Sequence, residues 1–387
     1  MTDPESATTT QQPRNTSLKV FCSPLRYVQG KGATRELGSQ LQAAGLAGPA
    51  YLVASPRAAE AMADLWRQTF GEVGMDYIVG AFGGECSDEE IERQTSAARA
   101  AGAGVIIGVG GGKSLDTSRA VAGNLGLPAV NCPTVASSDA PCSALSVVYT
   151  QAGVFERIIY YPHNPHLVLV DTELVAAAPR RHLVSGMGDA LATWFEARTV
   201  IDAHKANAVH GMSTLTARAL AELCCQTLLA DGATAAGDVE VGVVTPALER
   251  IVEANTLLSG LGFESGGLAI AHALHNGLTT APATHAFMHG EKVAFGLVVQ
   301  LVVEGRPIPE IVEVVDFCQQ VGLPTTLAEL NLSPDDLPTL QRVAERTVVR
   351  GESAHNEPFA VTADVIVDGI LAADRFGADR HAAAAAD

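Results

Sequence analysis

Short apolar runs alternate with longer amphipathic stretches through the first half of the chain. The runs are rich in β-branched residues and occupy residues 50–54, 76–82, 104–109, 129–132 and 167–171. Their length and composition are typical of buried parallel strands. Residues 58–70 and 88–101, which lie between runs, place apolar side chains at the helical period. We therefore predict an α/β fold with a doubly wound, mostly parallel sheet, which binds ligands at the carboxyl ends of its strands.

Helical patterns replace the strand-like runs after residue 171. They cover residues 189–200, 206–230, 246–259, 292–304 and 309–321, separated by Gly and Pro. The change predicts an α/β domain at residues 17–178 and an all-helical C-terminal domain at residues 179–380. The polar residues 1–16 are interpreted as a disordered tail. Residues 381–387 are interpreted as a second tail, although their alanines are also suited to extending a last helix.

Composition narrows the classes of protein to which the chain can belong. Its 387 residues suggest two domains, and 47% hydrophobic with 18% charged residues is typical of a globular protein. No run approaches the roughly 18 apolar residues of a membrane helix. The formal charge of -18 argues against nucleic acid and against an anionic membrane as partners, because both would repel it. Seven cysteines without a CxxC pair, and no secretory signal, predict reduced thiols and a cytoplasmic location.

Four of the eleven histidines fall within eighteen residues, at positions 272, 275, 285 and 289. His272 and His275 are three residues apart, and His285 and His289 are four apart, so each pair shares one face of a helix. This density predicts a metal centre, but the spacing leaves open which of the four are ligands. Asp189 begins another helical pattern, where an aspartate is commonly a cap. Together with the histidines it completes a carboxylate and imidazole set that suits zinc.

A glycine-rich turn, GVGGGKS at residues 108–114, follows a predicted strand and precedes a predicted helix. Its backbone N–H groups and Lys113 suit a phosphate at the helix N-terminus, although a plain tight turn is the alternative. It matches neither Walker A nor the Rossmann fingerprint, because Ile107 and Lys113 stand where each requires glycine. The loop at residues 132–150 follows the next strand. Its hydroxyl residues around Asp139 suit a polar ligand, and an ordinary Ser/Pro-rich connection is the alternative.

Six blocks of sequence extend these observations: GVGGGKSLDTSRAVA, PTVASSDAPCSALSVVY, NPHLVLVDTELVAAAP, SGMGDALATWFEAR, EANTLLSGLGFESGGLAIAHALHNG and HGEKVAFG. In this order and at these separations they closely resemble the iron-containing type of metal-dependent alcohol dehydrogenases, and within it the glycerol branch. The resemblance runs from about Leu18 to about Gly369. It implies a dehydroquinate synthase-like architecture, in which residues 17–178 bind the dinucleotide and residues 179–380 bind the metal.

The resemblance also implies a single metal site. Its ligands match Asp189, His272 and His289, and the usual ion in this branch is Zn2+. His275 and His285 match positions outside the ligand set. The histidine stretch is therefore expected to form one wall of a site between the two domains.

The cofactor site implied by the resemblance lies in the first domain. It comprises Ser55, Gly111, Gly112, Lys113, Asp116, Thr134, Ser137, Ser143, Leu145 and Tyr149. Close relatives carry an aspartate where Ser55 stands, and that aspartate selects NAD by accepting hydrogen bonds from the adenosine ribose. An arginine such as the nearby Arg57 favours NADP instead. NAD is the expected cofactor, with NADP as the alternative.

These parts predict hydride transfer between the secondary hydroxyl of glycerol, or of another small vicinal diol, and the nicotinamide, giving dihydroxyacetone or a hydroxyketone. A bound metal would lower the pKa of that hydroxyl. Asp139 matches the residue that binds the substrate's hydroxyls, and its loop indicates the glycerol branch. His275, one helical turn from His272, is expected to relay the proton to solvent. Family members are often dimers or octamers, so a homo-oligomer is expected.

Two alternatives compete with this reading. A dehydroquinate synthase-like lyase would use the same cofactors without net redox change. It would bind a phosphorylated substrate and need more basic residues near the metal than Lys292 and the more distant Arg250. A non-catalytic metal- or nucleotide-binding protein would need a broken ligand set or glycine loop, and the sequence shows neither.

Overall fold

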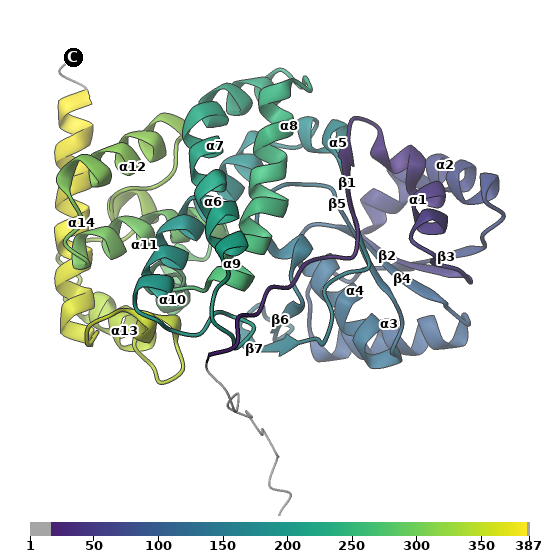
Figure 1. Ribbon diagram of the computed structural model, residues 1–387, viewed down its shortest axis with the longest axis horizontal. Helices are drawn as coiled ribbons and strands as arrows, with labels where there is room; N and C mark the ends of the chain where they lie inside the picture. Colours follow the sequence, from purple (N-terminus) through teal and green to yellow (C-terminus); the bar gives the residue numbers. More distant parts are fainter. Residues whose placement is uncertain (1–16, 385–387) are drawn as a thin grey trace, which may run out of the picture.

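The first half of the chain forms a six-stranded parallel sheet. The computed structural model describes residues 17–384, and its strand order is β1-β8-β5-β4-β2-β3, with every neighbouring pair parallel (Figure 1). The strands are β1 (Tyr27–Gly30), β2 (Ala50–Ala54), β3 (Tyr77–Ala81), β4 (Val105–Gly110), β5 (Ala129–Pro133) and β8 (Leu167–Asp171). β2, β4 and β8 are buried along their whole length, as continuous apolar runs require.

Helices cover both faces of this sheet. One face packs on η1 (Ala33–Glu36), α1 (Leu37–Ala43) and α2 (Pro56–Glu72), where Trp66 belongs to the same core as Leu52. The other face packs on α3 (Asp88–Ala100) and α4 (Gly112–Leu125), where Val121 belongs to the same core as Val53. Neighbouring residues of β2 thus serve opposite layers, because side chains alternate along a strand. The predicted α/β fold class is confirmed.

Two strand features are absent from the sequence prediction. β1, at the sheet edge, reads YVQG and has only half-buried positions, so it carries no apolar run. β6 (Leu145–Tyr149) and β7 (Phe155–Tyr160) form an antiparallel hairpin that begins within the predicted loop at residues 132–150. In β6, Ser146 and Val148 are buried toward α4 while their neighbours are half-buried, which is the two-residue period of a strand with one covered face.

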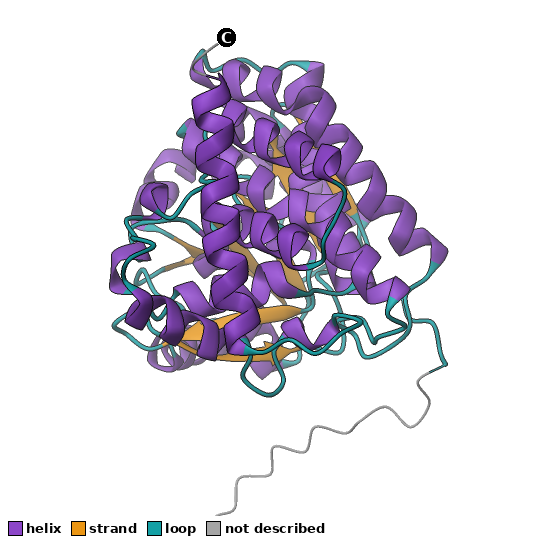
Figure 2. Ribbon diagram, turned by 90° about the vertical axis from the view of Figure 1, so that its left-hand side faces the viewer, coloured by secondary structure: helices purple, strands orange, loops and turns teal. Residues whose placement is uncertain are grey.

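The described chain from Thr172 onward is helical apart from loops and one isolated β-bridge at Met212. Figure 2, which faces this half, shows the helices in front of the sheet. The longer helices are α5 (Thr172–Ala176), α6 (Arg180–Asp202), α7 (Leu215–Glu240), α8 (Pro246–Glu253), α9 (Ser259–Gly266), α10 (Ile270–Leu278), α11 (His289–Val303), α12 (Ile308–Val321), α13 (Leu337–Thr347) and α14 (Ala363–Ala384). Short turns in this half are the π-helical η3 (Ala254–Leu258) and the 3-10 segments η4 (Pro282–Thr284), η5 (Ala328–Leu330) and η6 (Ser353–Asn356). A further 3-10 segment, η2 (Ala140–Cys142), lies between β5 and β6 in the first half.

The last helix corrects one predicted boundary. α14 continues to Ala384, so residues 381–384 are helical and do not belong to a tail. Alanine has the highest helix propensity, which is why the poly-Ala sequence sustains these turns. The predicted tail at residues 1–16 and the final residues 385–387 lie outside the described part of the chain.

The start of the described chain lies against the helical half. Residues 18–22, which we call the N-terminal strap, form a parallel bridge with Met212, where Val20 N donates to Met212 O at 3.0 Å. Cys22 N donates to Ser265 Oγ at 3.1 Å. In Figure 1 the dark purple strap passes along the helical half before the chain reaches β1. The strap therefore joins the first strand of the sheet to the helical half.

Within residues 17–384, no single helix is long and apolar enough to cross a membrane. One bent pair, Pro246–Gly266 with Ile270–Leu278, meets the length and composition criterion jointly, with a bend of 102° at its break.

Candidate metal and cofactor site

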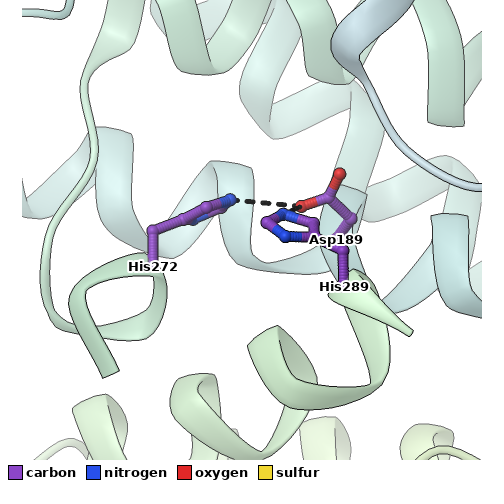
Figure 3. A group of neighbouring side chains, drawn as sticks. All are labelled: Asp189, His272 and His289. Atoms are coloured by element: carbon purple, nitrogen blue, oxygen red, sulfur yellow. Dashed lines mark hydrogen bonds and ion pairs between the residues drawn. The ribbon is translucent and has the colours of Figure 1, made fainter. Parts of the chain in front are cut away.

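Three side chains from separate helices converge in the helical half: Asp189 from α6, His272 from α10 and His289 from the first position of α11 (Figure 3). One ligand atom from each lies within 4.8 Å of the others. Nε2 of His272 and Nε2 of His289 lie 3.1 and 3.0 Å from the same carboxylate oxygen, Oδ1 of Asp189. Asp189 is fully buried. The structure thus brings together the three residues that the resemblance assigns to the metal.

Close contact between α6 and α11 places His289 beside Asp189. A Cβ atom on Gly290 would lie 1.7 Å from Ser185 O, and one on Gly188 would lie 2.4 Å from Gly290 O. Both positions therefore exclude any side chain, and the two backbones touch directly. Gly290 N also donates to Ser185 Oγ at 3.2 Å. The first turn of α11 is consequently held on α6, with His289 directed at the buried carboxylate.

The start of α10 is fixed by a carboxylate that sequence analysis missed. Glu196 Oε1 accepts hydrogen bonds from Ala269 N at 2.8 Å and from His272 N at 3.0 Å, while Oε2 lies 2.5 Å from His272 Nδ1. Glu196 follows Asp189 by seven residues in α6, which is about two helical turns and places both on one face. An acidic residue at this spacing from Asp189, inside an otherwise apolar stretch, is the signal that could have identified it.

The donor set fits a divalent metal ion. One carboxylate and two imidazole nitrogens converge, which suits zinc and several other divalent ions. Burial opposes ionisation of Asp189, but His289 and His272 outweigh it, so the pKa of this carboxyl is held well below its usual range. Burial also opposes protonation of His272, yet Glu196 and Asp189 raise the pKa of its imidazole well above the ordinary value. Both carboxylates thus favour a positive charge at this point, and a metal ion supplies one by displacing ring protons.

The other two histidines of the stretch take different positions. His275 Nε2 lies 3.0 Å from His289 Nδ1, and its own Nδ1 lies 3.2 Å from Asn276 Oδ1. Burial, followed by the charges of His289 and Lys292, lowers the pKa of His275 well below the ordinary value, so its ring is neutral. His285 is exposed and contacts Thr279 O at 3.0 Å. His275 therefore touches a predicted ligand, whereas His285 stands apart from the group.

Asp139 reaches the same place from the first half of the chain. Its backbone N–H donates to Asp189 Oδ2 at 3.1 Å, and its Oδ2 accepts from Ser259 Oγ at 2.8 Å. Its Oδ1 has no hydrogen-bond partner among the described residues. Burial, and then the charge of Asp189, raise the pKa of Asp139 well above its usual range. The loop after β5 therefore places a carboxyl group directly beside the group formed by Asp189, His272 and His289.

The glycine turn lies at the carboxyl end of β4. Gly111 precedes α4 as its N-cap, and a Cβ on Gly112 would meet nothing within 4 Å, so the first turn of the helix is open to a ligand. Lys113 Nζ lies 2.5 Å from Glu85 Oε2 and 5.5 Å from the centre of the Tyr149 ring. Lys113 and Tyr149, which are both predicted cofactor contacts, are therefore neighbours.

The remaining predicted cofactor residues occupy varied surroundings. Thr134 N donates to Gly110 O at 3.0 Å, which holds the loop after β5 beside the glycine turn. Asp116 is buried in α4 and ion-paired with Arg119; burial raises the pKa of its carboxyl to about 6, despite that cation. Ser55 follows β2 and caps α2 by accepting from Ala58 N at 3.2 Å. Three further residues belong to the loop after β5 and the start of β6: Ser137, whose carbonyl accepts from Ser185 Oγ, the buried Ser143 and the half-buried Leu145.

Comparison with known proteins gives the class of this fold and site. A family model described as iron-containing alcohol dehydrogenase matches residues 24–172. A glycerol dehydrogenase of Thermotoga maritima is 50% identical over 355 residues, which cover 92% of this chain and 96% of that protein. The chain therefore belongs to the iron-containing alcohol dehydrogenase family.

Two further members of the family are similar to this chain in sequence or structure. A glycolaldehyde reductase of Halobacterium salinarum is 46% identical over 92% of this chain and 98% of that protein. The crystal structure of glycerol dehydrogenase from Schizosaccharomyces pombe matches with a TM-score of 0.91 at 37% identity, covering 95% of this chain and 93% of that one. The same α/β sheet domain followed by a helical domain is thus found in a solved glycerol dehydrogenase.

Replacement of the converging histidines tests the ligand set. We expect His272→Ala and His289→Ala each to lose stoichiometric divalent metal, because each removes one of three donors. His285→Ala should retain the metal, because among the described residues its ring contacts only the backbone carbonyl of Thr279. The measurement is metal content per chain after dialysis, by elemental analysis. Full metal content in His289→Ala would refute the assignment.

Proposed function

We propose that this protein is a zinc-dependent oxidoreductase that interconverts glycerol, or another small vicinal diol, with dihydroxyacetone or the corresponding hydroxyketone, using a nicotinamide cofactor. The observation that carries the proposal is the contact between Asp139 and Asp189. This contact places Asp139, whose carboxyl group is suited to binding substrate hydroxyls, next to Asp189, which is suited to binding a metal. The glycerol dehydrogenases of Thermotoga maritima and Schizosaccharomyces pombe, both similar along most of this chain, support the choice of substrate.

Asp189, His272 and His289 would hold the ion in this scheme. A bound zinc ion would supply Lewis-acid chemistry at the substrate oxygen, and a nicotinamide ring would accept the hydride. The two imidazoles approach Asp189 Oδ1 from different helices, so these residues would supply three protein ligands. Catalytic zinc sites likewise have three protein ligands and leave a position for water or substrate.

Asp139 would select a diol over a simple alcohol. Its Oδ2 is held by Ser259, which fixes the carboxyl group, while Oδ1 has no partner within residues 17–384. A hydroxyl next to the reacting carbon can hydrogen-bond to this oxygen, and a simple alcohol has no such group. A polar group left without a partner costs about 1–3 kcal/mol, so the preference for a diol should be roughly 5- to 150-fold.

A spectrophotometric assay tests the activity directly. With glycerol or 1,2-propanediol and NAD, the absorbance of reduced nicotinamide should rise, and 1-propanol should react more slowly for the reason given above. Treatment with a chelator should abolish the signal, and added Zn2+ should restore it. A lyase of the dehydroquinate synthase type, or a non-catalytic binding protein, would give no net reduction of NAD. Lack of any chelator-sensitive signal with every diol and ketone would rule the proposal out.

NAD is the proposed cofactor, and the end of β2 is where its choice over NADP would be made. β2 pairs with β4, so Ser55 lies at the same sheet edge as the glycine turn. The Ser55 hydroxyl accepts from Ala58 N, and the exposed Arg57 has no partner among the described residues. A carboxylate here would accept from the 2′-hydroxyl of NAD and repel the 2′-phosphate of NADP.

Ser55→Asp should therefore shift the NAD to NADP ratio of kcat/KM toward NAD by at least about tenfold, because like charges repel at such contacts. Aspartate also caps helices well, so α2 should be preserved. The matched control is Thr214→Asp, which makes the same kind of cap substitution at the start of α7, outside the sheet. If Ser55→Asp leaves the NAD to NADP ratio of kcat/KM unchanged, the adenosine ribose does not bind beside residue 55.

We propose further that His275 assists release of the substrate proton. It touches the ligand His289 through Nε2, so it would act on the site through that side chain. His275→Ala should lower kcat by about 10- to 100-fold and alter its dependence on pH. His285→Ala, which changes the exposed histidine, should keep the wild-type profile. Superimposable pH–rate profiles for His275→Ala and the wild type would contradict this role.

A further inference from the structure

Glu196 is a carboxylate of α6 that does not belong to the proposed metal ligands but contacts one of them, His272. It is fully buried. Its Oε1 accepts from two backbone N–H groups at the start of α10, those of Ala269 and His272, at 2.8 and 3.0 Å. Its Oε2 lies 2.5 Å from His272 Nδ1. Within residues 17–384, every hydrogen bond of this carboxylate thus goes to the segment that carries His272.

The tautomer of His272 follows from this contact. A carboxylate can only accept, so Nδ1 of His272 must be the donor. In the neutral ring, a proton on Nδ1 leaves Nε2 with a free electron pair. Nε2 is the nitrogen that lies 3.1 Å from Asp189 Oδ1, on the side where the three donors converge. Glu196 therefore selects the form of the ring that is able to bind a metal.

The charge count of the site leads to the same residue. Asp189 and Glu196 are both fully buried, and within residues 17–384 neither is paired with a lysine or an arginine. In this described part of the chain, their only ion-pair partners are the rings of His272 and His289. A buried charge without a counter-charge is strongly unfavourable. Two carboxylates, each with one negative charge, match the two positive charges of a divalent cation.

We infer that Glu196 is a positioning residue of the metal site: it sets the tautomer of His272 and supplies the second buried negative charge that balances a divalent ion. The inference rests on the proposed metal site. The other histidine has a different partner, because Nδ1 of His289 meets the ring of His275. Of the two histidines, His272 is therefore the one whose Nδ1 contacts a carboxylate.

Glu196→Gln is the informative substitution. If the amide oxygen accepts from the two backbone N–H groups, the amide NH2 faces His272 Nδ1 and donates to it. The ring then protonates Nε2, which is the nitrogen directed at the site. The substitution preserves shape and the cap on α10 but removes the charge and reverses the tautomer. Loss of outer hydrogen-bond partners typically weakens metal binding 10- to 100-fold.

The experiment compares the metal-free wild type, Glu196→Gln and Glu264→Gln by titrating Zn2+ against a chromophoric competing chelator. Glu264 is the matched control, because it is also a buried carboxylate of the helical half that accepts from a backbone N–H, that of Ala144. We expect the Kd of Glu196→Gln to rise 10- to 100-fold and that of Glu264→Gln to stay within about twofold. The metal-free Tm values of the wild type and Glu196→Gln should agree, whereas the rise in Tm on adding Zn2+ should be smaller in Glu196→Gln.

Each outcome bears on a separate claim. If the wild type binds no divalent metal, the proposed metal site fails. If the wild type binds Zn2+ and Glu196→Gln binds it equally well, the site stands and the role of Glu196 is overturned. If Glu196→Gln does not fold, Glu196→Asp replaces it; this variant keeps the charge but shortens the reach by one methylene. A Kd raised about tenfold is then expected, and an unchanged Kd overturns the inference.

Discussion

The buried negative charge of Asp189 is the constraint on which the arrangement of the helical half depends. A carboxylate with no exposed surface needs close partners. It obtains them from His272 at the start of α10, from His289 at the start of α11 and from the backbone of Asp139 in the other half. Segments far apart in sequence must therefore end at one point. The direct backbone contact at Gly290 shows how closely α11 has to approach α6 to satisfy this requirement.

The same point joins the two halves of the molecule. The helix that begins at Pro246 widens into the π-helical turn η3 before α9, and π-turns are frequent at functional sites. From this region Asn255 Nδ2 donates to Ala136 O, and Ser259 Oγ donates to Asp139. Both acceptors belong to the loop after β5. The carboxyl end of the sheet, where ligands bind in this class of fold, is thus tied to the helices that carry the histidines.

The sequence predicts those parts of the molecule that follow from local periodicity. Five of the six sheet strands are visible as apolar runs: β2, β4, β5 and β8 are buried along all or most of their length, and β3, although largely unburied at one edge of the sheet, keeps an apolar sequence. β1 is half-buried at the other edge, and its YVQG sequence gives no such signal. The hairpin β6–β7 is hidden because one face is covered and the other is not, which leaves only a weak alternation. The helical half is predicted as helices. The π-helical turn η3, with the sequence ANTLL, contains no Pro or Gly and therefore gives no signal in the sequence.

Local spacing is less informative about the site. The density of histidines indicates a metal, but spacing alone cannot separate His272 and His289 from His275, because the choice depends on which rings face α6. Resemblance to the family supplies that choice. Glu196 escapes both approaches, since its role arises from contact between α6 and the start of α10, 73 residues away. The seven-residue spacing places Glu196 on the same face of α6 as Asp189, but its partner on α10 is set by tertiary packing.

The N-terminal strap has a mechanical consequence for the whole chain. The two halves are joined covalently at two places: residues 23–26 lead from the strap into the amino end of β1, and Asp171 leads from the carboxyl end of β8 into α5. β1 and β8 are neighbours, so these two anchors lie at opposite ends of one strand pair. Two fixed points define an axis, and the rigid-body motion that leaves both in place is rotation about it. Any opening of the molecule would therefore swing β2 and β3, at the far edge of the sheet, through the largest arc.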